Sequence, residues 1–318
     1  MLWFYIFIFL GSCALLYFSG GWVIGGLMRM ARFLGWREFV VAFLVMAFAA
    51  SLPNLFVGIS SALHKIPQLS FGDVVGGNVV DLTLAIALAA LVAKGLPAKS
   101  RMIQSSSIFT IVIAILPLLL ILDGVLGRGD GIILILVFIF YLFWLFSKKE
   151  RFTKIYEENK TPFVKEFKIF LRDIGKVILG IVILLVAAEG IVKSAQFFAS
   201  NFNLEISLIG ILIVGLGNAI PETYFAIASA KKGQTWMILG NLMGSIIVPA
   251  TLVLGIVALI YPIEITNFSP FAIARFFLII SAIFFLWVVR SGQKITKKEA
   301  LFLLGIYILF VGVEILMR

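Results

Sequence analysis

The sequence predicts an all-α membrane protein in which ten transmembrane helices form two inverted five-helix repeats. Apolar residues make up 62% of the 318 residues, charged residues make up 13%, and the mean hydropathy is +1.14, whereas soluble domains carry about 25% charged residues. Ten apolar segments are each long enough to cross, or nearly cross, a bilayer. The two halves of the chain also share Pro and Gly residues at a constant spacing.

The ten segments follow one another with short connections. A window of about 19 residues places them at residues 2–28, 38–63, 68–93, 102–122, 130–147, 173–198, 206–230, 235–260, 271–290 and 299–317. The longest polar interruption is too short for a domain, and its mixed charges predict a solvated linker or an interfacial helix. We therefore divide the chain into a first repeat at 1–147, a linker at 148–172 and a second repeat at 173–318.

The basic residues predict how the helices are oriented. The chain has 26 Lys and Arg against 16 Asp and Glu, a net charge of +10, which we attribute to membrane loops rather than to nucleic-acid binding. With the N-terminus outside, 21 of the 26 basic residues lie on the inside and 5 on the outside. Because basic residues collect in cytoplasmic loops, we expect a multi-pass cell-membrane protein with both termini outside and the 148–172 linker in the cytoplasm. The first segment lacks a basic n-region, so we expect a membrane helix rather than a signal peptide.

The repeats are visible without gaps in the alignment. Residues 40–92 align with residues 208–260 at an offset of 168, and 12 of the 53 positions are identical. The pairs that interrupt helices are Pro53 with Pro221, Gly72 with Gly240, and Gly76 with Gly244. Each repeat holds five segments, an odd number, so the second repeat enters the membrane from the opposite side. Inverted repeats with matching Pro and Gly interruptions indicate a secondary transporter with a site near the bilayer midplane.

Two acidic residues, Asp81 and Glu222, lie near the centres of the third and seventh segments. A carboxylate at that depth costs at least ~2.5 kcal/mol on insertion scales, so it marks a candidate functional site. Polar residues of the same segments and their neighbours complete a candidate ligand set of Ser51, Asn54, Asn78, Asn218 and Ser245. Every member can present oxygen, which suits hard cations such as Ca²⁺, Mg²⁺ or Na⁺. We expect transported cations and no cofactor.

The prolines and glycines support this site in different ways. Pro53 and Pro221 are expected to free backbone carbonyls at residues 48–50 and 216–218, which a bound cation could satisfy. A plain proline kink packed against neighbouring helices is the alternative. The glycines at spacings of four predict close helix packing of the small-xxx-small kind.

These motifs resemble those of the sodium/calcium exchangers, within the wider cation/calcium antiporters. The two repeats of that family carry a Ser-x-Pro-Glu-like helix break followed by Gly-Asn-x-x-Gly-Ser-Asn-x-x-Asn/Asp. The first repeat here reads Ser51-Leu52-Pro53-Asn54 and then GDVVGGNVVD from Gly72 to Asp81. The second repeat reads Ala219-Ile220-Pro221-Glu222 and then GNLMGSIIVP from Gly240 to Pro249. The resemblance implies a compact exchanger in which segments two, three, seven and eight form a cation cage and segments one and six slide past it.

The resemblance also implies roles for particular positions, and this chain departs from several of them. In the family an acid at the positions of Asn54 and Glu222 holds Ca²⁺, and the positions of Asp81 and Pro249 help to bind the counter-ions. Here Asn54 lacks the carboxylate, Asp81 is an acid where Asn is frequent, and Pro249 replaces a polar or acidic ligand. Hydroxyl groups are also missing at Ala50, Gly77 and Ala219.

We therefore expect a secondary antiporter that exchanges Ca²⁺ for Na⁺ or H⁺, with the lipid bilayer and inorganic cations as its partners. Neither nucleic acid nor a protein partner is implied. A passive cation channel could use the same cage, and the lost carboxylate at Asn54 keeps open a degenerate homologue with altered ion selectivity. An intramembrane enzyme is disfavoured, because the one histidine, His64, lies in a loop and the aspartates lack a protease context.

Three weaker features complete the sequence. Asp73 stands near the outer end of the third segment, as either an entrance partner of the cage or a solvated helix start. Glu189 and Lys193 are spaced to pair with each other on one helix face. Cys13, the single cysteine, is expected to be a small packing residue.

Overall fold

The computed structural model describes residues 1–33, 48, 51–99, 101–147, 163–233, 235–265 and 269–316. Within these residues nine helical spans are long and apolar enough to cross a membrane. The tenth expected segment, at 38–63, is described mainly from residue 51 onwards, where it forms a shorter apolar helix. The regular structure of the described residues is helical apart from four two-residue strands.

The helices of the first repeat are α1 (Leu2–Phe33), α4 (Leu52–Leu63), α5 (Gln68–Val80), η2 (Asp81–Ala85), α6 (Ile86–Val92), α7 (Arg101–Leu120), η3 (Ile121–Asp123) and α8 (Arg128–Ser147). Those of the second repeat are α9 (Phe163–Phe202), α10 (Ile206–Leu208), η5 (Ile209–Val214), α11 (Gly215–Lys231), α12 (Thr235–Val248), η6 (Pro249–Val253), α13 (Leu254–Ile260), α14 (Ser269–Ser291) and α15 (Lys297–Leu316). The elements η2, η5 and η6 are π-helical turns, and η3 is a 3₁₀ turn.

The two repeats match each other residue by residue in the centre of the bundle. Both η2 and η6 span five residues and begin 168 positions apart, as do α6 and α13 after them. Thr83 in η2 and Thr251 in η6 each donate a hydrogen bond to the carbonyl four residues earlier. The offset found in the sequence therefore holds in the backbone, and two inverted five-helix repeats are confirmed. π-Turns inside α-helices are frequent at functional sites.

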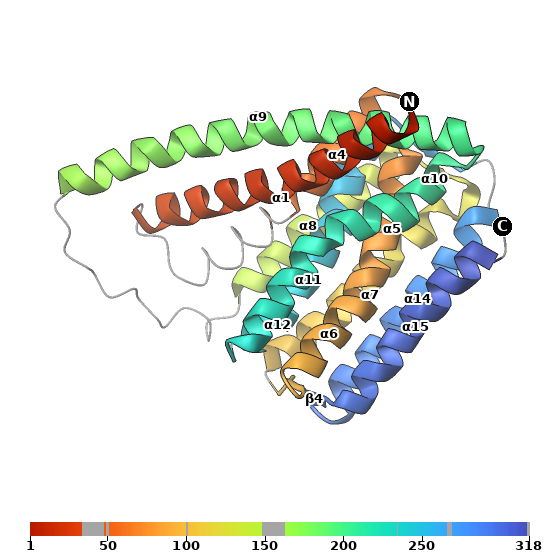
Figure 1. The fold of residues 1–318 in the computed structure, drawn as a ribbon. Coiled ribbons are helices and arrows are strands. Elements are labelled where there is room, and N and C mark those ends of the chain that lie inside the picture. Colours follow the sequence, from red (N-terminus) through yellow and green to blue (C-terminus); the bar gives the residue numbers. More distant parts are fainter. Residues whose placement is uncertain are drawn as a thin grey trace.

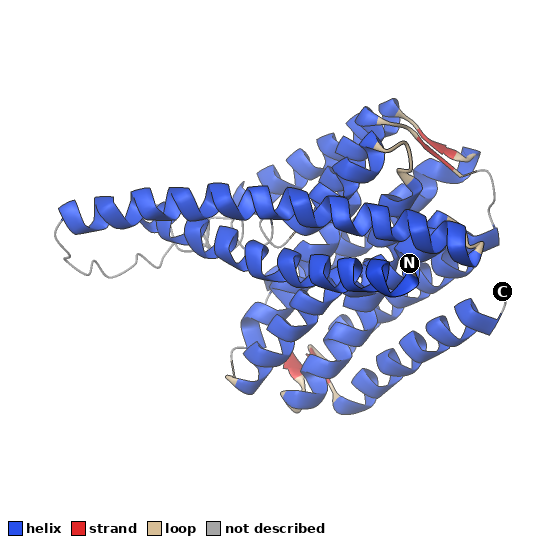
Figure 2. Cartoon of the chain, turned by 45° about the horizontal axis from the view of Figure 1, so that its top comes forward, coloured by secondary structure: helices blue, strands red, loops and turns tan. Residues whose placement is uncertain are grey.

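The four strands join one repeat to the other. Strand β1 (Leu96–Pro97) pairs antiparallel with β4 (Lys294–Ile295), and β2 (Val125–Leu126) pairs antiparallel with β3 (Ile263–Glu264). Each pair thus contains one strand from each repeat, and the two pairs lie at different ends of the bundle (Figure 2).

Helices α1 and α9 lie side by side and run obliquely to the other helices (Figure 1). Helix α9 has 40 residues, a length of about 60 Å, which is about twice the hydrocarbon thickness of a bilayer. Buried residues of α1, α4 and α9, together with Leu69, Ile209 and Val214, form a hydrophobic cluster separate from the one that fills the rest of the bundle. The α1–α9 pair therefore packs through this cluster against α4 and the adjoining residues of α5 and η5.

Small residues and one ion pair hold α1 against α9. A Cβ atom on Gly180 would lie 3.2 Å from the Ser19 carbonyl oxygen, and one on Gly190 would overlap Ser12 Oγ. Arg29 binds Asp173 through two hydrogen bonds of 2.7 and 2.8 Å, and the Asp173 side chain is fully buried. The pair is consequently fastened near one end by charge and along its length by close backbone contact.

The predicted close packing at glycines is confirmed where α5 crosses η5. A Cβ atom on Gly72 would lie 2.3 Å from the Ser207 carbonyl oxygen, and one on Gly76 would lie 2.0 Å from the Ile211 carbonyl oxygen. In the opposite direction, a Cβ atom on Gly210 would lie 2.5 Å from the Leu69 carbonyl oxygen. The backbones of the two repeats touch here, and only glycine leaves room for the contact.

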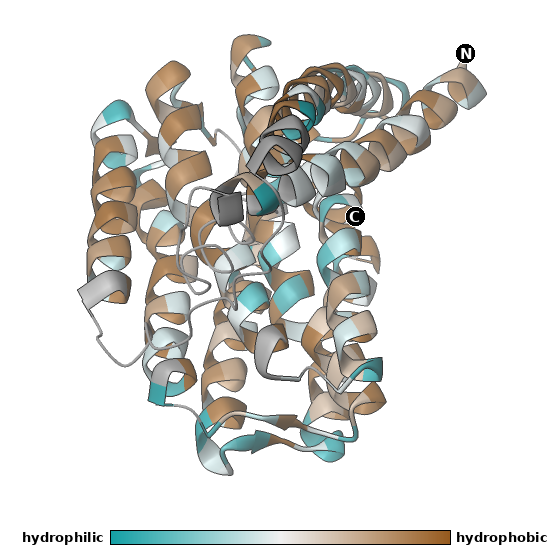
Figure 3. Cartoon of the chain, turned by 90° about the vertical axis from the view of Figure 1, so that its left-hand side faces the viewer, coloured by the Kyte–Doolittle hydropathy of each residue, from teal (hydrophilic) through white to brown (hydrophobic). Residues whose placement is uncertain are grey.

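The surface agrees with a membrane location. Large apolar side chains such as Phe140, Phe143 and Ile308 are more than half exposed. Hydropathy along the helices is high, with hydrophilic residues near the helix ends and at a few places inside the bundle (Figure 3). The outward-facing apolar side chains are in contact with lipid in a bilayer.

Helix α9 begins at Phe163, ten residues before the start expected for the sixth segment. Residues 163–172 of the expected linker are therefore helical, which agrees with the interfacial-helix alternative, and residues 148–162 lie outside the described part. The prolines do not break helices in the same way, because Pro53 lies in the first turn of α4 whereas α11 continues through Pro221. Of the carbonyls expected to be freed by Pro53, those of Ala49 and Ala50 lie outside the described residues.

Candidate cation site

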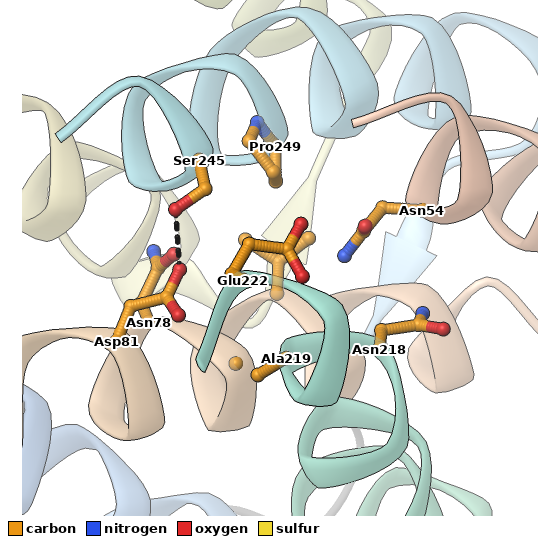
Figure 4. A pocket seen from close by; sticks show the side chains of 10 residues that line it. Asn54, Asn78, Asp81, Asn218, Ala219, Glu222, Ser245 and Pro249 are labelled. Atoms are coloured by element: carbon orange, nitrogen blue, oxygen red, sulfur yellow. Dashed lines mark hydrogen bonds between the residues drawn. The ribbon is translucent and has the colours of Figure 1, made fainter. Parts of the chain in front are cut away.

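A small pocket in the middle of the bundle collects most of the predicted site residues. The residues that line it come from α4, α5, η2, α11, α12 and η6, and they are Asn54, Val74, Gly77, Asn78, Asp81, Asn218, Ala219, Glu222, Ser245 and Pro249. In the view of Figure 4, Asp81, Asn78 and Ser245 lie on one side of Glu222, and Asn54 and Asn218 lie on the other. The central helices of both repeats thus contribute to one pocket.

Asp81 opens the π-turn η2 and is 4% exposed. Its Oδ2 accepts a hydrogen bond of 2.6 Å from Ser245 Oγ, which also lies 2.9 Å from the Leu242 carbonyl oxygen. Its Oδ1 is buried without a hydrogen-bond partner among the described residues. One carboxylate oxygen is therefore fixed by the second repeat, and the other is open to a ligand.

Glu222 follows Pro221 on α11 and is 7% exposed. Its Oε2 has no hydrogen-bond partner in the described part of the chain. Neither Glu222 nor Asp81 takes part in the ion pairs found among the described residues. Buried carboxylates without a counter-charge are costly, and the pocket holds two of them.

Not all of the predicted uncharged site residues line the pocket. Asn78 and Asn54 line the pocket from the first repeat, and Asn218 lines it from the second. Ser51 is buried immediately before α4 but is not among the residues that line the pocket. Gly77, Ala219 and Pro249, where the sequence lacks oxygen ligands, also line it.

No group of three or more His, Cys, Asp or Glu residues in the described part of the chain is arranged to hold a metal ion. Ca²⁺ sites in proteins usually have six oxygens or more, which is more than two carboxylates supply. The other side chains with an oxygen that line the pocket are those of Asn54, Asn78, Asn218 and Ser245.

Asp73 is the acidic residue whose place the sequence did not reveal. It is completely buried on α5, so the expectation of a solvated helix start is wrong. Asn218 Nδ2 lies 3.0 and 2.9 Å from its two carboxylate oxygens, and Asn54 Nδ2 lies 3.5 Å from Oδ2. The available signal was its position in the motif, since Asp73 occupies the Asn position of the Gly-Asn pair that the second repeat keeps as Gly240-Asn241.

A second polar cluster links α4 to α9 away from the pocket. Glu189 and Lys193 pair as predicted, with Nζ 3.2 Å from Oε1. Glu189 also accepts a hydrogen bond of 2.9 Å from Ser60 and lies 3.2 Å from His64 Nε2. The pairing is thus part of a contact between two helices, which the spacing on one helix face could not predict.

Comparisons with known proteins agree with this arrangement. The family described as "Sodium/calcium exchanger protein" matches residues 4–147 and 173–316. An uncharacterized membrane protein of Methanocaldococcus jannaschii is 26% identical over 306 residues, 96% of each chain. The sodium/calcium exchanger MaX1 of Methanosarcina acetivorans is 23% identical over 321 residues, which cover 89% of this chain and 91% of that protein.

A solved structure shares the whole fold. The sodium-calcium exchanger NCX_Mj, soaked with 10 mM Na⁺ and no Ca²⁺, superposes with a TM-score of 0.67 at 25% identity. The match covers 98% of this chain and 99% of that chain.

Proposed function

Because the chain belongs to the sodium/calcium exchanger family, we propose that it is a secondary antiporter that exchanges Ca²⁺ for Na⁺ or H⁺ across a cell membrane. One observation carries the proposal. Asp81 and Glu222, donated by oppositely oriented repeats, line one buried pocket, and each has a carboxylate oxygen without a partner among the described residues. A divalent cation between them would neutralise both charges.

The ligand roles follow from this placement. Asp81 and Glu222 supply the charge, and Asn54, Asn78, Asn218 and Ser245 supply neutral oxygens around them. Ser51, which lies before the first turn of α4, does not line the pocket, and we assign it no ligand role. An all-oxygen set of this kind favours hard cations over soft metals.

The choice of Ca²⁺ and Na⁺ is supported by the family and by the ions used with its solved member. NCX_Mj has been soaked with Na⁺, Ca²⁺ and Sr²⁺. Two carboxylates can neutralise one Ca²⁺, two Na⁺ or two protons. The same pocket can therefore hold either the Ca²⁺ or the cations that are exchanged for it. Competition for shared ligands couples the two fluxes without a separate coupling device.

Alternating access requires part of the molecule to move past the pocket. The α1–α9 pair is suited to this role, because the ion pair of Arg29 with Asp173 fastens one helix to the other and the pair lies obliquely to the remaining helices (Figure 1). We propose that the pair moves as one piece against the remaining helices of the two repeats, which we bound at 1–147 and 173–318 and which the 148–172 region joins. The charge bias of the loops supports a cytoplasmic linker and outside termini, and protease access to tags at each end in inverted vesicles tests that orientation.

Flux into proteoliposomes tests the function. Wild-type protein should take up radioactive Ca²⁺ only when Na⁺ or H⁺ is available on the opposite side of the membrane. The variants Asp81→Asn and Glu222→Gln keep size and shape and should lose at least about tenfold in uptake, because charge-assisted ligand contacts are worth ~1.5 to 3 kcal/mol each. Asp123→Asn, an exposed loop residue, is the matched control.

Other outcomes point to other functions. Uptake that needs no cation on the trans side indicates a channel. A wild-type protein that binds cations but moves none is a degenerate homologue. Wild-type rates in both pocket variants would sink the assignment of the site.

A further inference from the structure

Asp73 is a buried carboxylate that the pocket does not use. It lies eight residues before Asp81 on the same helical run, about 12 Å along the axis, and it is not among the residues that line the pocket. Asn54 and Asn218, which do line the pocket, both contact it. The two amides therefore stand between two separate carboxylate positions.

Asp73 takes part in none of the ion pairs found among the described residues, which join Asp173 to Arg29 and Glu189 to His64 and Lys193. Asp173 shows the contrast, because it is equally buried but is bound by Arg29 through two hydrogen bonds. For Asp173 the counter-charge is a cationic side chain of the same protein. Among the described residues, the side chains that donate to Asp73 are only the neutral amides of Asn54 and Asn218.

The fold does not require the charge at this position. The offset of 168 places Asn241 of the second repeat opposite Asp73 in the alignment, directly after the matching glycine. A neutral amide of the same size therefore serves the helix at the equivalent point. The carboxylate of Asp73 is therefore not needed for helix packing, and we attribute it to ligand binding.

The neighbouring groups form an oxygen set. Ser70 lies three residues earlier on the same face of α5, and its buried Oγ has no hydrogen-bond partner among the described residues. It faces Gly58, one turn after Asn54 on α4. Rotation of the two asparagine amides by half a turn exchanges their nitrogens for oxygens. Asp73, Asn54, Asn218 and Ser70 can then surround a small hard cation.

The surroundings of Asp73 also border α1, which we propose moves together with α9. Cys13 of α1 lies 3.5 Å from the point where a Cβ of Gly217, the neighbour of Asn218, would stand. Movement of α1 would open or close the approach to Asn218 and to the carboxylate that it binds.

We propose that Asp73, with Asn54, Asn218 and Ser70, forms a second cation site that takes a monovalent metal ion of the Na⁺ class, beside the pocket of Asp81 and Glu222. The single negative charge suits a monovalent ion, since a divalent ion would remain half compensated. This inference rests on the proposed exchange function and adds a third carboxylate to its charge count, so the protein can carry one more Na⁺ than the pocket alone allows. The shared asparagines let a cation at one site change the ligands offered to the other.

Counting bound Na⁺ tests the site. Purified protein in detergent, free of Ca²⁺, is dialysed to equilibrium against saturating radioactive Na⁺. Asp73→Asn, which reproduces the residue of the second repeat, should bind one Na⁺ fewer per chain than wild type. Asp73→Glu should keep the count and bind more weakly, and Asp123→Asn, which can keep its contact to the Val125 amide, should match wild type.

Each result decides the question. An equal Na⁺ count in wild type and Asp73→Asn overturns the second site, even if Ca²⁺ exchange in vesicles is normal. Loss of one bound Na⁺ in the variant supports the site, even if wild type moves no Ca²⁺, in which case the exchange function fails alone. If Asp73→Asn and Asp73→Ser both fail to fold with and without Na⁺, the carboxylate is structural and the proposal is wrong.

Discussion

At the scale of single residues, the main result concerns the carboxylate expected at position 54. It is absent there, and a buried carboxylate of another residue, Asp73, lies beside Asn54. The sequence shows Asn54 where related exchangers are expected to have an acid, and by itself this reads as a lost ligand. In the structure, Asn54 Nδ2 lies 3.5 Å from Oδ2 of the buried Asp73. The charge is present one helix away. Sequence spacing predicted Asp81 and Glu222 correctly as inward-facing acids, but it could not predict Asp73, because contact between α4, α5 and α11 decides its burial.

Restoring the expected acid should therefore harm the protein. Asn54→Glu removes a donor from Asp73 and places a second negative charge beside it, which should lower stability by about 2 kcal/mol, as expected when a buried charge loses its partner. Adding Asp73→Asn to the same chain should recover most of the loss, because residues in contact couple by ~0.5 to 3 kcal/mol.

Thermal unfolding in detergent with a chelator present measures both variants. Asp73→Asn alone is measured as well, so that the coupling energy between the two substitutions can be calculated. Equal melting temperatures for Asn54→Glu and wild type, or no recovery in the double variant, would contradict the account of a displaced charge.

At the scale of elements, the sequence predicted the glycine contacts but not the π-turns. Gly72 and Gly76 stand out because their spacing places them on one face of a helix, and the structure puts both against carbonyl oxygens of the second repeat. The π-turns η2 and η6 leave no such mark, because a shift in backbone hydrogen bonding changes no residue type. Asp81 and Pro249 open these turns although they share no chemistry, so the backbone has kept a symmetry that the side chains have lost.

The close contact at Gly76 gives a sharp prediction. Gly76→Ala would put a methyl group 2.0 Å from the Ile211 carbonyl oxygen, and since that atom belongs to a packed backbone, the helices must separate. We expect a loss of about 3 kcal/mol, the upper part of the usual range for overpacking. Unfolding in detergent or the yield of folded protein measures it.

Gly312→Ala is the matched control on α15, where a Cβ atom meets nothing within 4 Å among the described residues. Alanine there should be neutral or should stabilise the helix by up to about 1 kcal/mol. Similar behaviour of the two variants would mean that the backbones of α5 and η5 do not touch at Gly76.

At the scale of the whole molecule, the sequence predicted the membrane class, the segments and their inverted arrangement, because apolar length and repeat offset survive in composition. It did not predict that α1 and α9 form an oblique pair that shares a hydrophobic cluster with α4 (Figure 1). That pairing depends on contacts between residues more than 140 positions apart, such as Arg29 with Asp173, and no local pattern encodes them.

Cross-linking tests whether this pair moves as one piece. In a Cys13→Ala background, cysteines at Ser12 and Gly190 join α1 to α9 at a point where their Cβ positions lie 3.3 Å apart, and transport should survive. Cysteines at Ser60 and Glu189, whose side chains meet at 2.9 Å, can be joined by a short bis-methanethiosulfonate, which forms a disulfide with each thiol. This link ties α9 to α4 and should stop Ca²⁺ flux.

A reductant should restore flux in the second variant, which separates immobilisation from damage caused by the substitutions. If the α1–α9 link blocks transport and the α4–α9 link does not, the two long helices move relative to each other and the single-piece description fails.

The strand pairs between the two repeats have a consequence for biosynthesis. Leu96 of β1 pairs with Ile295 of β4, so β1 has no partner strand until the ribosome has made a further 199 residues. The first repeat must therefore stay in the membrane as an incomplete intermediate while the second repeat is synthesised.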